Sequence, residues 1–136
     1  MGLFDEISGA LGSVFSDLSE TDKSEVMFIT SPFTLLGLHR KPDLWMASYL
    51  LSFSYGMYQM KYNQSPSIAV KKEILKKVFG NTDGIRLYAE MISKLQDPSE
   101  EMDDGCKSAI KDFKQWFQSG EQEGPVRWLE YMYKVK

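Results

Sequence analysis

The chain has 136 residues, a formal net charge of −3 and 43% hydrophobic residues, a composition typical of one globular domain. The acidic balance argues against general nucleic-acid binding, because phosphate contact depends on clustered lysine and arginine. A single cysteine excludes an intramolecular disulfide and fits a reducing compartment. Met1–Glu6 lacks the basic start of a secretory signal, so we expect a cytoplasmic protein.

The first segment, residues 1–20, predicts an amphipathic helix. Its apolar side chains recur at helical spacing and fall on one face, with Asp5, Glu6 and Asp17 on the other. The polar face has no lysine or arginine before Glu20, whereas helices that lie on membranes usually carry basic residues there. We expect this helix to dock on the rest of the domain or in a partner's groove. Its candidate binding residues are Phe4, Leu11 and Phe15.

Serine–proline pairs indicate where the next helices begin. After a short apolar run, Val26–Thr30, Ser31-Pro32 has the form of an N-cap followed by proline at the first helical position. We expect that helix to end near Leu38. Ser65-Pro66 has the same form, and Gly80 suits the end of the helix that follows.

Three further helices are expected in the second half of the chain. The first follows Asn81, with a core face of Ile85, Tyr88, Met91, Ile92 and Leu95. The second covers about Ser99–Gln118, with one stripe of Cys106, Ile110, Phe113 and Phe117. The last begins at Pro125 and turns inward Trp128, Tyr131, Met132 and Val135. No alternating strand pattern occurs. We predict one all-α domain over residues 1–136, a compact bundle of about six to eight helices around a central apolar helix, Leu44–Asn63.

The central helix carries no charge from Leu44 to Met60. That length reaches the lower limit of a membrane span, but serines and Gly56 dilute it, and Asp43 and Lys61 lie close to its ends. We therefore favour a buried helix in a bundle. A strip of small residues predicts close approach by another helix at Ser48, Ser52 and Gly56.

This helix is apolar on two sides. The arc around Trp45, Tyr49 and Phe53 is typical of a core. The other arc contains three tyrosines at i, i+3 and i+7, and each buried tyrosine hydroxyl needs a hydrogen-bond partner. We predict that this arc either borders the core or binds a partner through Tyr55, Tyr58 and Tyr62.

No residue pattern predicts a catalytic, metal or cofactor site. His39 and Cys106 are the only residues of their type, too few for a structural zinc site. Asp97–Gly105 is acidic but lacks the spacing of a calcium loop, and fits the start of a helix. A basic cluster on the helix before Gly80 has the form of a solvated face, with phosphate or an acidic partner as the alternative: Lys71, Lys72, Lys76 and Lys77.

These observations predict a small acidic helical protein that acts without catalysis by protein–protein binding, of the immunity, inhibitor or adaptor type. Because Met1–Glu25 and Asp97–Asp104 are strongly acidic, we expect a partner with a basic surface, or else a second copy of the chain. One alternative is membrane association through the N-terminal helix or residues 44–60. The other is an enzyme with a site that the sequence does not reveal.

Overall fold

The computed structural model describes residues 18–120, 122 and 124–134, and confirms the all-α prediction. Within these residues the chain forms six helices and no strand: α2 (Glu20–Leu36), α3 (Leu44–Tyr62), α4 (Ile68–Phe79), α5 (Asn81–Ser93), α6 (Glu100–Gln118) and α7 (Val126–Met132). The expected amphipathic N-terminal helix lies outside the described residues.

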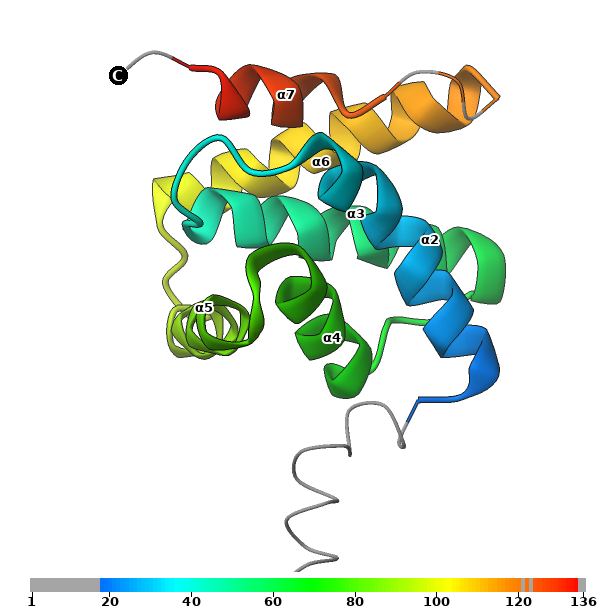
Figure 1. Cartoon of the computed structure of the whole chain (residues 1–136), viewed down its shortest axis with the longest axis horizontal. Helices are drawn as coiled ribbons and strands as arrows, with labels where there is room; N and C mark the ends of the chain where they lie inside the picture. Colours follow the sequence, from blue (N-terminus) through cyan, green and yellow to red (C-terminus); the bar gives the residue numbers. More distant parts are fainter. Residues whose placement is uncertain (1–17, 121, 123, 135–136) are drawn as a thin grey trace, which may run out of the picture.

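Helix α3 is the centre of the bundle. Its first seven residues, Leu44–Leu50, are all buried, and it packs against α6, α4 and α5. The Asp43 carboxylate accepts a hydrogen bond from the Met46 N–H at 3.0 Å and begins the helix. Figure 1 shows α3 and α6 running side by side in the same direction, with α7 at the top of the view, and α7 contacts both helices through Trp128 and Arg127. Among the described residues, no helix has the length and apolar character needed to cross a membrane.

The axes of α3 and α6 approach closely at Gly105. A Cβ at this position would lie 2.3 Å from the Trp45 carbonyl oxygen, so any larger residue would push the helices apart. The Ser48 hydroxyl donates to the Met102 carbonyl of α6 at 2.6 Å, and Phe113 covers Gly56. Ser48 and Gly56 therefore face α6, as the strip of small residues predicted.

Helix α2 is continuous, so the prediction of a new helix at Ser31-Pro32 is wrong. Its N-cap is Ser19, whose side chain accepts from the Asp22 N–H, and Pro32 lies inside the helix. Proline removes one helical hydrogen bond. The helix persists because Ile29 and Phe33, on either side of the proline, are 2% and 1% exposed and anchor both halves to the core.

The boundaries around α4 also differ from prediction. Ser67, rather than Ser65, caps α4 and accepts a hydrogen bond from the Val70 N–H at 3.2 Å. Gly80 ends α4 as expected, and α5 begins at the next residue. Its φ of +92° suits glycine, which has no Cβ to oppose this conformation, so Gly80 turns the chain between two helices in a single residue.

The predicted core face of α5 is right in part. Tyr88 and Met91 are buried as predicted, but Ile85, Ile92 and Leu95 are 54%, 49% and 59% exposed. Leu87 and Gly84 are buried in α5 instead. Helix α6 turns a different face inward from that predicted, made of Met102, Gly105, Ala109 and Asp112. The predicted stripe of α6, Cys106 to Phe117, therefore lies on the flank of the helix. In α7, Trp128 and Met132 are buried as predicted, and Val135 lies outside the described residues.

Candidate functional site

A buried carboxylate joins α3, α6 and α7. Asp112 is fully buried and accepts hydrogen bonds from the Tyr49 hydroxyl at 2.5 Å, the Arg127 guanidinium at 2.8 Å and the Arg127 backbone N–H at 2.9 Å. Burial raises the pKa of the Tyr49 hydroxyl, and the nearby Asp112 charge raises it further. With its charge paired and its oxygens bonded, Asp112 fixes α7 on the bundle.

The acidic end of the bundle is held by aromatic residues. The Trp45 indole N–H donates to Asp104 at 2.6 Å, and the Tyr131 hydroxyl donates to Asp43 at 2.5 Å. The Trp45 and Tyr131 rings stack with centroids 3.9 Å apart. Beside them lies an open hollow of about 470 Å³, also lined by Glu100, Glu101, Asp103 and Lys107.

Charges at this end affect one another. Burial raises the pKa of the Glu101 carboxyl, and the charge of Asp43 adds to the shift. Ser99 caps α6 here by accepting from the Met102 N–H, so the acidic segment begins a helix as predicted. No group of three or more histidine, cysteine, aspartate or glutamate side chains in the described part of the chain is placed to hold a metal ion.

The three tyrosines of α3 do not form one exposed patch. Tyr58 is 2% exposed, and its hydroxyl donates to Asp22 at 2.7 Å. The Tyr62 hydroxyl donates to Glu25, also at 2.7 Å. The element that covers these two tyrosines is therefore α2 of the same chain, and Tyr55 alone of the three is more than half exposed, at 51%. Three other candidate residues lie outside the described part: Phe4, Leu11 and Phe15.

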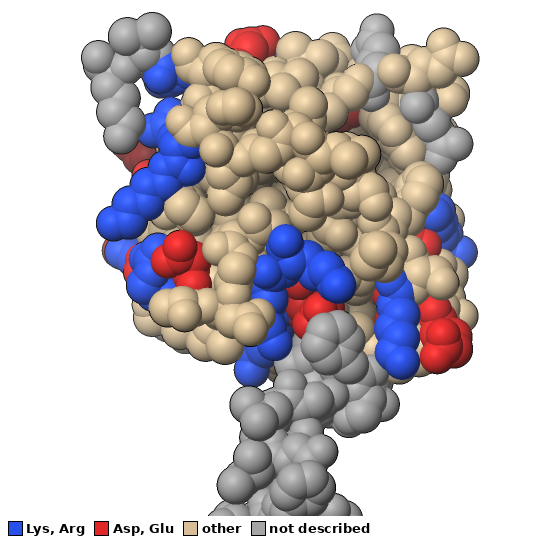
Figure 2. Space-filling view, in the orientation of Figure 1, with Lys and Arg blue, Asp and Glu red and all other residues tan. Residues whose placement is uncertain are grey.

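The remaining sequence candidates have internal contacts. The His39 ring lies 4.6 Å from the Tyr133 ring, and its Nε2 is 3.0 Å from the Tyr133 hydroxyl. In the basic cluster, Lys76 and Lys77 approach the buried Glu73 carboxylate at 4.0 and 3.9 Å. Figure 2 shows basic side chains gathered over α4, in the lower part of the view. Part of this cluster therefore compensates a buried charge.

An apolar stripe has Ile110, Phe113 and Phe117 on one face of α6 and Leu51 and Tyr55 on one face of α3. We call it the α3–α6 apolar flank and define it by Leu51, Tyr55, Ile110, Phe113 and Phe117. Tyr55, Ile110 and Phe117 are 51%, 44% and 57% exposed. Phe113 covers Gly56, the residue after Tyr55, and its ring stacks on Phe117 with centroids 6.5 Å apart.

Lysines border this flank on α6. Lys107 precedes Ile110 by three residues and Lys114 precedes Phe117 by three, so each is a neighbour on the helix surface. Both are exposed, and neither forms an ion pair within the described residues. Lys107 also lines the acidic hollow beside Glu101 and Asp103, so Lys114 is the lysine that adds positive charge to the flank.

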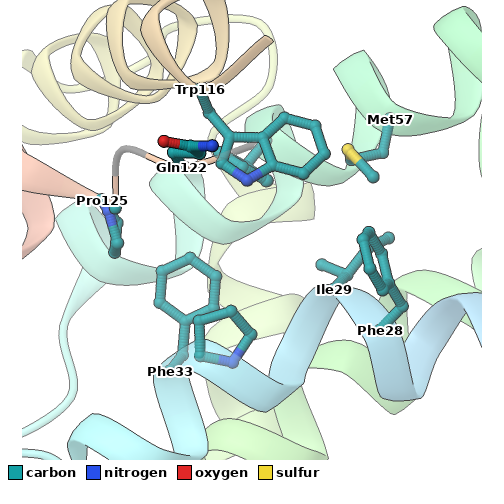
Figure 3. A pocket seen from close by; sticks show the side chains of 10 residues that line it. Phe28, Ile29, Phe33, Met57, Trp116, Gln122 and Pro125 are labelled. Carbon is teal, nitrogen blue, oxygen red and sulfur yellow. The ribbon is translucent and has the colours of Figure 1, made fainter. Parts of the chain in front are cut away.

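A second feature is an aromatic cavity of about 340 Å³ between α2, α3 and α6, beside the segment that leads into α7. Figure 3 shows Phe28, Phe33, Met57 and Trp116 around it. The Trp116 ring meets the Phe28 and Phe53 rings edge-on, with centroids 6.2 and 6.1 Å apart.

Sequence reasoning missed this cavity. Trp116 lies next to the predicted stripe of α6 rather than on it, and Phe28 belongs to a segment that was not read as part of a longer helix. The spacing of residues within one helix carries no signal that brings residues 28, 53 and 116 together.

Comparisons with models of known protein families, with curated proteins and with solved structures found no match to this chain.

Proposed function

We propose that the protein binds a protein partner through the α3–α6 apolar flank, as an adaptor or inhibitor would. The exposed stripe of Tyr55, Ile110 and Phe117 on two adjacent helices supports this proposal. Scattered exposed apolar residues are ordinary, whereas grouped ones favour an interaction surface.

The shape and charge of the flank favour an amphipathic helix as the bound element. Exposed apolar side chains lie on two neighbouring helices, and a partner helix can place apolar side chains against such a stripe at i, i+3 and i+4 spacing. Lys114 favours an acidic residue on that helix. For this surface we therefore propose an acidic partner, whereas the basic partner expected from the acidic segments suits the hollow at the other end of α6.

The test is affinity capture with matched variants. The full chain would be immobilised and exposed to extract of its native cells, and the captured protein identified, purified and titrated against each variant. We expect Tyr55→Ser with Phe117→Ser to weaken binding at least tenfold. Leu35→Ser is the control, because Leu35 is 86% exposed but lies on α2, and we expect it to bind like the unmodified chain.

Two outcomes would overturn the proposal. One is a captured protein that binds the double variant and the unmodified chain with equal affinity. The other is a dimer in light scattering that the double variant converts to a monomer, since a second copy would then occupy the flank.

A further inference from the structure

We propose that the aromatic cavity binds a small, flat, mainly apolar molecule that carries one neutral hydrogen-bond acceptor. This site adjoins the α3–α6 apolar flank, since the Phe113 ring lies 5.5 Å from that of Phe53 and 6.1 Å from that of Trp116, but Tyr55, Ile110 and Phe117 do not line it. The cavity's form, the Trp116 indole and the uncharged lining within the described residues support this inference.

The cavity has the size and lining of a ligand site. Its volume, about 340 Å³, lies within the range of roughly 300–1,000 Å³ common for small-molecule pockets. Phe33, Phe53 and Met57 are 1%, 8% and 0% exposed, so these walls belong to the packed core. Aromatic faces and edges from Phe28 and Trp116 complete an environment suited to a planar apolar molecule.

The Trp116 indole and the Gln122 amide are polar groups of the lining. Figure 3 shows the indole nitrogen on the side of the ring that faces the cavity. Half-buried Trp116 has no hydrogen-bond partner for this N–H among the described residues, whereas the Trp45 N–H donates to Asp104 at 2.6 Å. The Trp116 N–H is therefore available to donate to a ligand oxygen in the cavity.

The charges favour a neutral ligand. No charged side chain in the described part of the chain lines the cavity. Lys61 lies over the Phe28 ring, 4.2 Å from its centroid, but its ammonium bonds Glu25 at 3.0 Å. An anion would enter an apolar space without a free cation and pay the cost of desolvation, so a carbonyl or ether oxygen suits the site better than a carboxylate.

The experiment uses the full chain, labelled with nitrogen-15, and two probes, 2-acetylnaphthalene and naphthalene. The three tryptophans give three indole N–H signals, and Trp116→Phe identifies the signal of Trp116. We expect 2-acetylnaphthalene to shift the Trp116 signal while those of Trp45 and Trp128 stay in place. One neutral hydrogen bond should make its Kd about three- to tenfold lower than that of naphthalene.

Variants separate this site from alternatives. Trp116→Phe should bind both probes with equal affinity, and Phe28→Trp, which narrows the cavity, should weaken both. The Tyr55→Ser and Phe117→Ser variant should bind the probes like the unmodified chain, so failure here differs from failure of the partner proposal. The inference is overturned if neither probe binds, if Trp45 or Trp128 shifts instead, or if Trp116→Phe still prefers the ketone.

Discussion

The two flanks of α6 differ in what covers them. On one flank α7 packs against the helix, and Asp112 is fully buried with three hydrogen bonds from Tyr49 and Arg127. On the other flank, Ile110 and Phe117 are 44% and 57% exposed. The same helix therefore carries a buried charge on one side and exposed apolar side chains on the other, the reverse of simple expectation.

This difference predicts that the α7 flank contributes to folding stability and the open flank to binding. The buried Asp112 carboxylate depends on its hydrogen bonds from Tyr49 and Arg127, because an unpaired buried charge destabilises the fold. The open flank keeps apolar area that folding leaves uncovered, so its removal should cost little stability. Three measurements test whether the two flanks divide these tasks.

The largest expected effect follows from Asp112→Ala. The change leaves the buried Tyr49 hydroxyl without its acceptor, which costs about 1–3 kcal/mol, and it also removes the ion pair with Arg127, whose side chain is 32% exposed. Urea denaturation followed by circular dichroism measures the free energy of unfolding. Asp112→Asn keeps one acceptor oxygen and should lose less, while a loss below about 1 kcal/mol in Asp112→Ala would show that α7 is held by other contacts.

Alkaline pH should destabilise the same flank. Burial and neighbouring carboxylates raise the pKa values of the Tyr49 and Tyr131 hydroxyls, so each stays protonated in the folded state above the unfolded pKa of about 10. The contribution of these hydroxyls to the free energy of unfolding is therefore fully present below pH 10. It falls as the pH rises, by up to about 1.4 kcal/mol per pH unit for each tyrosine. Unfolding midpoints between pH 8 and 12, with tyrosinate absorbance, check this, and a flat profile would contradict it.

The smallest effect is expected on the open flank. Ile110→Ser removes a side chain that is 44% exposed, and surface changes of this kind usually shift stability by less than about 1 kcal/mol. Its urea denaturation curve, beside that of Asp112→Ala, compares the two flanks directly. A loss as large as that of Asp112→Ala would mean that the open flank also supports the fold.

Sequence patterns predicted the number and approximate limits of the helices better than their inner faces. Capping and helix-ending residues act locally, so Ser99 and Gly80 marked helix ends correctly, although Ser31-Pro32 and Ser65-Pro66 did not. The inner faces of α5 and α6 depend on contacts between helices, where Gly84 and Gly105 permit close packing and Asp112 finds partners on α3 and α7. Apolar periodicity considers only the spacing of apolar residues within one helix. It therefore predicted neither these inner positions nor the cavity at Trp116.

Gly105 also determines how α3 and α6 are able to move. Its contact with the Trp45 carbonyl allows the two helices to lie close together near the acidic end, where hydrogen bonds from Trp45 to Asp104 and from Ser48 to Met102 hold them. Trp116 lies eleven residues further along α6, about 16 Å at 1.5 Å per residue. A separation of the helices that widens the cavity is therefore a rotation about Gly105 rather than a parallel displacement, and the acidic end serves as its pivot.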